Sequence, residues 1–159
     1  MRKNFAETSE PISQPGCYSL IIDLKRPKMV CVGKLGAVLF PKGIYVYTGS
    51  AMNGLAARLR RHCQPVKKLH WHIDYLLALP EARIEKIVIY PAASGQECRQ
   101  SQRIAALPGA AVVLKRFGAT DCKRGCTSHL SHFTSEAKLK FSGSSIICLN
   151  SLSTRLTGL

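Results

Sequence analysis

The stretch GIYVYTGSAMNGLAARLRRHC, Gly43–Cys63, decides the fold of this chain. Its first six residues are mostly β-branched or aromatic, and they predict a strand. Gly49 and Ser50 are expected to end that strand, and Asn53 suits the N-cap of a helix that continues to Cys63. The stretch therefore predicts a strand that passes through a glycine turn into a short basic helix.

The same stretch gathers side chains that suit a phosphodiester. Tyr45 and Tyr47 are two residues apart in the expected strand, so they share one of its faces. Arg58 and His62 are four residues apart in the expected helix and lie on one stripe, with Arg61 beside them. Guanidinium groups can hold a phosphate, and an imidazole can move a proton. We therefore expect a phosphodiester-binding surface here.

Two motifs in the stretch resemble the second half of the signature of the GIY-YIG nucleases. They are Tyr47-Thr48-Gly49 and the R-x-x-R-H sequence that begins at Arg58. The literal Gly43-Ile44-Tyr45 is continuous with Tyr47, so it cannot form the neighbouring strand that the first half of the signature requires. Gly16-Cys17-Tyr18, on an apolar stretch of its own, matches that first half.

The wider pattern is similar to a stand-alone subfamily, DUF123. The similarity covers about residues 15–133 and rests on short motifs spread along the chain. These motifs are the KLG stretch at 34–36, FPKG at 40–43, WHIDYL at 71–76, the pair Glu97-Cys98, and the FGxxDC and SHL sequences that begin at residues 117 and 128.

The resemblance implies an endonuclease that hydrolyses DNA phosphodiester bonds with one divalent cation, Mg²⁺ or Mn²⁺. Arg58 corresponds to the arginine that the family uses on the scissile phosphate, and Glu97 to its metal-binding glutamate. Tyr18 and Tyr47 would flank the same phosphate, where they could activate or orient a water. His62 could carry a proton or bond a phosphate oxygen.

Each of these residues also has a structural interpretation, which for Arg58 is a solvated basic face of the helix. Glu97 lies three residues after Ser94, which is the spacing of a helix capping box. The two tyrosines could simply pack within a sheet, and a lone histidine is more often structural than catalytic. The chain has only nine acidic residues, which favours one cation held by one carboxylate and waters over a site for several metals.

The charge balance points to a polyanionic partner. The chain of 159 residues carries 23 Lys and Arg against nine Asp and Glu, a formal charge of +14. DNA is the expected partner, with RNA or branched DNA as alternatives. Beyond the catalytic residues, the side chains expected to contact nucleic acid are Arg60, Arg61, Lys67, Lys68 and His72.

The remaining composition describes an ordinary globular protein. A hydrophobic content of 46% suits one domain with a real core, and no apolar run approaches the length of a membrane span. Seven cysteines, an odd number without a disulfide pattern, predict a reducing cytoplasm. No obligate protein partner is readable.

A second metal site is suggested near the end of the expected domain. Cys122 and Cys126 are four residues apart, and His129 and His132 follow three residues apart. Thiolates and imidazoles are the usual ligands of structural zinc. The alternative is a hairpin whose cysteines are small buried fillers and whose His129 packs near the active site.

The predicted fold is α+β, with a central and mostly antiparallel sheet flanked by helices. Residues 16–133 form the expected domain, between a loose arm at 1–15 and a tail at 134–159 without clear periodicity. Helices are expected around 53–63, 70–79 and 94–107, with Ser94 as the cap of the third. Strands are expected at 16–24, at 29–32 as the partner of the first, at 84–90 and at 111–116.

Two other functions compete with the nuclease. One is a non-catalytic basic module that binds DNA or RNA through the same surface, with or without zinc. The other is a structural or partner-binding domain whose charge is incidental. The nuclease needs Glu97, whereas a nucleic-acid-binding module needs only salt-dependent affinity.

Overall fold

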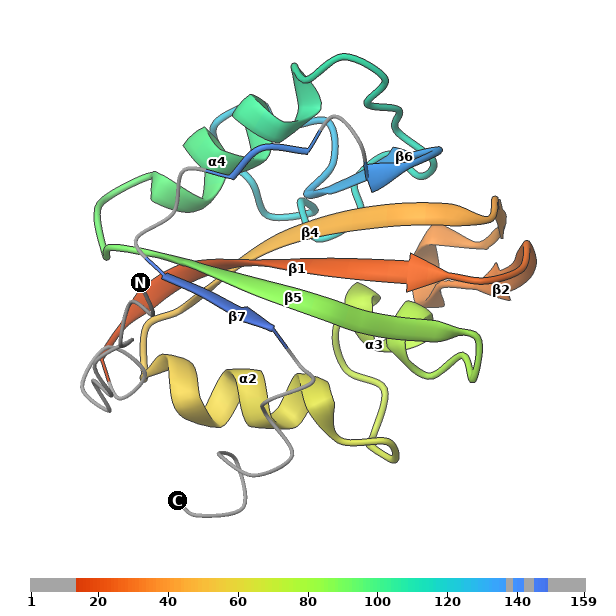
Figure 1. Cartoon of the computed structure of the whole chain (residues 1–159), viewed down its shortest axis with the longest axis horizontal. Helices are drawn as coiled ribbons and strands as arrows, with labels where there is room; N and C mark the ends of the chain where they lie inside the picture. Colours follow the sequence, from red (N-terminus) through yellow and green to blue (C-terminus); the bar gives the residue numbers. More distant parts are fainter. Residues whose placement is uncertain (1–13, 137–138, 142–144, 149–159) are drawn as a thin grey trace, which may run out of the picture.

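The computed structural model describes residues 14–136, 139–141 and 145–148. Its centre is a five-stranded sheet in the order β6-β4-β1-β5-β7, with every neighbouring pair antiparallel (Figure 1). The strands are β1 (Gly16–Leu24), β4 (Gly43–Ala51), β5 (Ala82–Tyr90), β6 (Leu130–Phe133) and β7 (Ser145–Cys148). The helices are α2 (Leu55–Cys63), α3 (His72–Leu77) and α4 (Gln96–Ala105). The predicted α+β class with a flanked antiparallel sheet is confirmed.

The pairing of β1 with β4 brings together the two tyrosines of the motif. Tyr18 lies opposite Gly49, and Tyr47 lies opposite Leu20. The ring centroids of Tyr18 and Tyr47 are 6.5 Å apart. The prediction that these two residues occupy adjacent strands is confirmed, and the intervening residues fold away from the sheet as a separate hairpin.

The helices cover both faces of the sheet. One face packs against α2 and α3 through a core that includes Leu20, Tyr45, Leu55 and Ile73. The other face packs against α4 through a smaller cluster around Ile104. Figure 1 shows α4 on one side of the sheet and α2 with α3 on the other. This alternation follows from the twofold period of a strand, which sends successive side chains to opposite faces.

Strand β4 is longer than predicted. Gly49 and Ser50 do not end it; they pair with Tyr18 and Cys17, and the strand continues to Ala51. The pairing of β4 with β1 along its whole length outweighs the weak strand propensity of glycine. Ser50 is therefore held in a strand, and its side chain has a fixed direction.

Two strand predictions are wrong. The segment expected to pair with β1 instead forms β2 (Lys28–Cys31), which pairs with β3 (Ala37–Phe40) in a separate two-stranded sheet. Residues 111–116 form no strand and contribute a single bridge between Ala111 and His132. In the first case β4 and β5 already flank β1, so no edge of β1 is open to β2.

The helices are shorter than predicted, and two of their caps differ. The N-cap of α2 is Gly54 rather than Asn53, and that of α4 is Gly95 rather than Ser94. Gly95 has a φ of 70°, a left-handed conformation that favours glycine. No side chain caps α4, so the capping-box interpretation of Glu97 is wrong and its carboxylate is free for other contacts.

The predicted ends lie largely outside the described residues. Of the arm at 1–15 the structure describes only residues 14 and 15, and of the tail at 134–159 only 134–136, 139–141 and 145–148. The last of these segments is β7, which pairs with β5. The sheet therefore receives a strand from a segment in which the sequence pattern predicts none.

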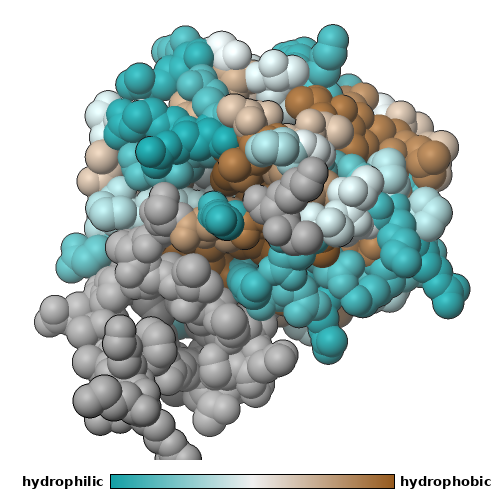
Figure 2. Space-filling model, turned by 45° about the horizontal axis from the view of Figure 1, so that its top comes forward, coloured by the Kyte–Doolittle hydropathy of each residue, from teal (hydrophilic) through white to brown (hydrophobic). Residues whose placement is uncertain are grey.

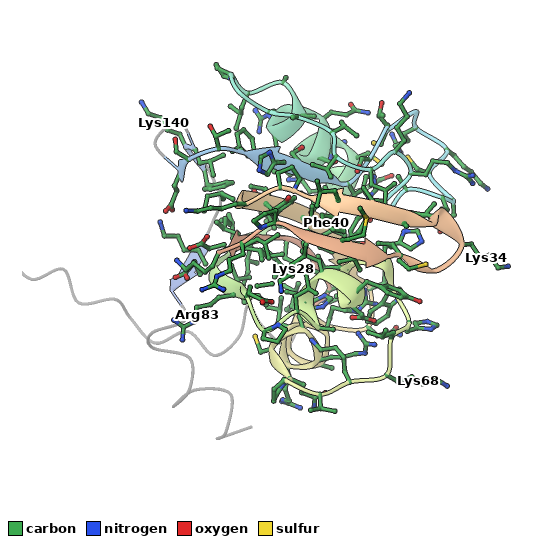
Figure 3. All side chains as sticks on the ribbon, turned by 90° about the vertical axis from the view of Figure 1, so that its right-hand side faces the viewer. Lys28, Lys34, Phe40, Lys68, Arg83 and Lys140 are labelled. Carbon is green, nitrogen blue, oxygen red and sulfur yellow. The ribbon has the colours of Figure 1, made fainter. Side chains whose placement is uncertain are left out.

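Several charged side chains point outwards from this core. Figure 3 shows Phe40 in the interior, while Lys34, Lys68, Arg83 and Lys140 extend outwards at the periphery. The face drawn in Figure 2 carries hydrophilic areas on two sides of a band of hydrophobic atoms. Among the described helices, none combines the length and apolar character that crossing a bilayer requires.

Candidate functional site

A groove of about 710 Å³ opens where the end of β4 meets the start of α4 and two loops. One loop precedes α3 and carries His70 and Trp71; the other follows residue 117 and carries Cys122, Cys126 and His129. The groove is lined by Tyr47, Ser50, Met52, Asn53, Arg58, His70, Trp71, His72, Glu97, Cys98, Gly118, Thr120, Asp121, Cys122, Lys123, Arg124 and His129. Of the predicted catalytic residues, Tyr47, Arg58 and Glu97 therefore line one groove.

Ser50 connects the two faces of the sheet at this groove. Its hydroxyl donates to Oε2 of Glu97 at 2.7 Å, on the side covered by α4. Its backbone carbonyl accepts from Arg58 Nη1 at 3.0 Å, on the side of α2. Arg58 and Glu97, which are 39 residues apart in the sequence and opposite in charge, are thus both hydrogen-bonded to Ser50.

Glu97 is ionised under ordinary conditions. Burial raises the pKa of its carboxyl, but His129 and the Ser50 hydroxyl lower it by more, so the pKa lies below its usual value. His129 Nδ1 lies 3.0 Å from Oε1 of Glu97. That contact is poorly aligned for a hydrogen bond, and Nδ1 has no other partner among the described residues. A half-buried, ionised carboxylate at the wall of a groove can hold a cation.

The two tyrosines occupy different positions relative to the groove. Tyr47 lines it, whereas Tyr18 is fully buried behind it. Burial raises the pKa of both phenols well above the ordinary value, so both are protonated at neutral pH. Gly49 makes their approach possible, because a Cβ there would lie 2.7 Å from the Tyr18 hydroxyl oxygen.

His62 is a buried neutral base rather than an exposed proton carrier. Its Nε2 lies 2.7 Å from the Tyr18 hydroxyl, and only 2% of the residue is exposed. Burial, with help from Lys67, lowers its pKa to about 3. The prediction that His62 bonds a phosphate oxygen directly is wrong, because the residue is buried and its Nε2 already contacts the Tyr18 hydroxyl.

Arg58 is the guanidinium that faces the groove. Its Cζ lies 4.2 Å from the ring centroid of Trp71, a cation–π contact that fixes its direction. No carboxylate of the described residues forms an ion pair with Arg58. Its charge is therefore available to an anion.

Some of the side chains predicted to contact nucleic acid are already bonded to other groups of the protein, and others are not. Arg61 donates two hydrogen bonds of 2.8 Å to the buried Asp74, so it is a structural residue. Lys67 Nζ donates to the carbonyl of His62 at 2.6 Å. Arg60 Nε is buried without a partner, whereas Lys68 is exposed (Figure 3). His72 lines the groove, and its Nδ1 accepts the backbone N–H of Gly118 at 2.9 Å.

A four-residue cluster at the far wall of the groove could hold a metal such as zinc. It consists of Cys98, Cys122, Cys126 and His129, whose candidate ligand atoms all lie within 4.8 Å of one another. Three members match the predicted zinc set. Backbone N–H groups of Arg124 and Cys126 lower the pKa of the Cys122 thiol to about 6.

The prediction that His132 is the fourth metal ligand is wrong. It lies in β6 opposite Tyr45, its ring centroid 4.8 Å from that of the tyrosine, and its Nε2 is 3.0 Å from the Lys42 carbonyl. His129 precedes β6 and His132 lies within it, and the two rings have different neighbours, Glu97 for the first and Tyr45 for the second. Cys98 on α4 takes the fourth position instead.

Sequence reasoning missed three residues of the site. Cys98 could have been found from its place beside Glu97, since the first turn of α4 carries both. Ser50 was hidden by the expectation that the strand ends there. Trp71 was not among the expected site residues, although Arg58 and Arg61, five and two positions before the end of α2, both lie over its ring.

Comparison with known proteins gives one match. The family model described as a domain of unknown function, DUF123, matches residues 17–148, which include the groove and the Cys/His cluster. No curated protein and no solved structure matches the chain.

Proposed function

The chain belongs to the DUF123 family, and we propose that it is a metal-dependent endonuclease of GIY-YIG type that hydrolyses DNA phosphodiester bonds. The observation that carries the proposal is the convergence of Arg58 and Glu97 on Ser50 at the rim of one groove. A cation-holding carboxylate beside a free guanidinium is the pair of groups that a scissile phosphate requires.

The type of nuclease is proposed from the arrangement of the motifs. Tyr18 and Tyr47 lie on adjacent antiparallel strands, and β4 leads directly into the helix that carries Arg58. This is the order of strand, strand and helix that the resemblance implies. The net charge of +14 supports a nucleic-acid substrate.

Glu97 would hold one Mg²⁺ or Mn²⁺. The donors fit a hard cation, because a carboxylate and the Ser50 hydroxyl are oxygen ligands and the groove leaves room for waters. When bound, such a cation neutralises phosphate charge and lowers the pKa of a coordinated water. Asp121 also lines the groove and is the one further carboxylate among its described residues.

Arg58 binds and orients the phosphate. Nη1 donates to the Ser50 carbonyl and the guanidinium also interacts with the Tyr18 hydroxyl, and the remaining N–H groups can donate to phosphate oxygens. Stacking on Trp71 restricts the side chain before the substrate arrives, so less conformational entropy is lost on binding. The developing charge on the phosphate is stabilised by the same fork.

The tyrosines act as hydrogen-bonding groups. Both phenols are protonated at neutral pH, so Tyr47 donates from the groove wall and orients a water or a phosphate oxygen. Tyr18, with His62 2.7 Å from its hydroxyl, supports Tyr47 from behind and does not face the groove. His62 is thus a positioning residue.

One observation favours the second candidate, a nucleic-acid-binding module without cleavage. Burial shifts the pKa values of Tyr18, Tyr47 and His62 away from neutrality, so none of them is a ready general base. In that case Arg58, with Lys123 and Arg124 of the loop after residue 117, would bind a phosphate without cleaving it.

The test is cleavage of supercoiled and branched DNA by the full chain with Mg²⁺, with Mn²⁺ and with EDTA. Cleavage that needs the cation is expected. Glu97→Gln should lower its rate by about 100-fold or more while DNA affinity is kept, because the carboxylate is removed without changing side-chain shape. Glu85→Gln, which changes a carboxylate outside the groove, is the matched control. Salt-dependent binding without any cleavage of either DNA would favour the module.

A further inference from the structure

The Cys/His cluster has the composition and the spacing of a closed metal site. We propose that Cys98, Cys122, Cys126 and His129 bind a structural zinc ion that joins α4 to the loop between residues 117 and 129. Three thiolates and one imidazole make a common ligand set for structural zinc and leave no open position for a substrate. The proposal is independent of the nuclease activity proposed above.

The distances agree with a tetrahedral ion. With Zn–S bonds of about 2.3 Å, two ligand sulfurs of a tetrahedron lie about 3.8 Å apart. Cys98 Sγ and Cys122 Sγ are 3.7 Å apart, and Cys98 Sγ lies 4.0 Å from His129 Nε2. The full set lies within 4.8 Å, so small side-chain rotations bring all four atoms to one ion.

A disulfide does not account for these contacts. A bonded pair of sulfurs is about 2.05 Å apart, much closer than Cys98 and Cys122. A third thiol and an imidazole also point into the same small volume, which a single disulfide would not need. Convergence of four ligand atoms from two separate segments is what an ion requires.

The surroundings already orient the sulfurs. The backbone N–H of Arg124 donates to Cys122 Sγ at 3.4 Å. Gln102, one helical turn beyond Cys98, donates to Cys126 Sγ at 3.5 Å and to the Arg124 carbonyl at 3.4 Å. Hydrogen bonds to coordinating sulfurs are typical of the outer shell of a metal site. Between residues 117 and 129 the structure has no helix or strand, so an ion would supply the order that regular structure does not.

His129 links this site to the groove. Its Nε2 faces the sulfurs, while its Nδ1 lies 3.0 Å from Oε1 of Glu97. Metal-bound histidines usually direct their second nitrogen at a carboxylate, which fixes the ring. With zinc on Nε2, the proton is on Nδ1 and faces Glu97, so the ion would also hold the carboxylate in place.

The experiment measures metal in the purified, reduced full chain by mass spectrometry. About one equivalent of zinc per chain is expected. Cys98→Ser should lower the content several-fold, and Cys31→Ser, an exposed cysteine outside the cluster, should leave it unchanged. His132→Ala should also retain the zinc, which separates this ligand set from one that includes His132.

Cobalt substitution provides the second measurement. Co²⁺ added to the metal-free chain should give the visible bands of tetrahedral thiolate coordination, and Cys122→Ser should weaken their sulfur charge-transfer component. A folded wild-type chain that carries no zinc and gives no cobalt bands would overturn the proposal, and so would unchanged zinc in Cys98→Ser. Neither readout uses DNA, so loss of cleavage alone cannot be mistaken for loss of this site.

Discussion

The hydroxyl of Tyr18 lies 2.7 Å from Nε2 of His62, and both residues are buried. This contact joins β1 to the last turn of α2, behind the groove. Because the imidazole is buried and Lys67, Arg58 and Arg61 lie near it, a positive charge on it is costly, and its pKa falls to about 3. A histidine so placed stabilises the fold only while it is neutral.

Acid should therefore unfold the chain partly through His62. The folded pKa is about 3, below the ordinary 6.5, so the unfolded chain binds more protons between these values and stability falls as the pH falls. Between pH 7 and pH 4 this residue should account for about 3 kcal/mol of lost unfolding free energy. His62→Gln should show a smaller loss over that range in urea titrations.

The control is His70→Gln, which changes an exposed histidine in the neighbouring loop. It should keep the wild-type dependence on pH. Equal slopes in His62→Gln and the wild type would mean that His62 does not titrate in this way.

Gly49 should be intolerant of a side chain. A Cβ at this position lies 2.7 Å from the Tyr18 hydroxyl oxygen and 3.1 Å from a carbon of the Tyr47 ring, in a fully packed region. Gly49→Ala is expected to cost about 2 kcal/mol of unfolding free energy through overpacking. Since the closest atom is the hydroxyl, the cost should shrink in a Tyr18→Phe background.

Urea titration of the two single variants and the double variant measures that coupling. A cost of Gly49→Ala that is the same with Tyr18 and with Phe at position 18 would contradict the steric explanation.

Strand pairing was predictable only where a motif identified both partners. Tyr18 and Tyr47 belong to the two halves of one signature, so the neighbouring positions of β1 and β4 followed from the sequence. The β2 strand has an ordinary apolar pattern that fits any open edge, and the pattern does not reveal that β5, more than 50 residues later, occupies the edge of β1. Which of two distant strands pairs with a given edge cannot be predicted from the local sequence of either strand.

The metal cluster was predictable to three ligands for a similar reason. Cys122, Cys126 and His129 are close in sequence, so their types and spacing suffice. Cys98 is 24 residues before Cys122 and arrives only because α4 packs beside the loop. His132 satisfied the spacing but lies in a strand, whose twofold period turns it away.

Asp74 should be essential for the loop before α3. It is fully buried, it accepts two hydrogen bonds from Arg61, and it accepts the backbone N–H groups of His70 and Trp71. Asp74→Asn should cost about 3 kcal/mol of unfolding free energy, because the Arg61 charge loses its partner. Burial raises the pKa of Asp74 but these donors lower it by more, so the pKa lies below its usual value.

The sign of that shift gives the control. The contribution of Asp74 is present above its ordinary pKa and is lost as the pH falls through the lower folded value. The difference in stability between the wild type and Asp74→Asn should therefore shrink in strong acid. A constant difference from pH 7 to pH 2 would show that the carboxylate charge is not what stabilises the loop.

Arg58→Lys separates charge from geometry. Lysine keeps the positive charge but loses the planar fork and much of the stacking on Trp71. If the chain cleaves DNA as proposed, single-turnover cleavage should fall by about 100-fold while DNA affinity changes only a few-fold. Arg83→Lys, at a residue that lies at the periphery in Figure 3, should cleave at the wild-type rate. Full activity in Arg58→Lys would remove Arg58 from the reaction.

DNA binding should depend on salt through the cations that remain available at the groove. Lys123 and Arg124 are exposed and line it, whereas Arg61 is committed to Asp74 and Lys67 to a backbone carbonyl. In the Lys123→Ala, Arg124→Gln double variant, the magnitude of the slope of log affinity against log salt should decrease by about 1.8, because each lost phosphate contact contributes about 0.9. Fluorescence anisotropy with a short duplex at several salt concentrations measures that slope.

The matched control is Lys34→Ala with Arg83→Ala, which removes the same charge from the periphery of the molecule seen in Figure 3. Long-range attraction falls equally in both double variants, so only contacts to DNA can separate their slopes. An equal slope in the two would mean that the groove does not bind the phosphate backbone. The end of α2, with Arg60 and the exposed Lys68, would then be the next surface to test.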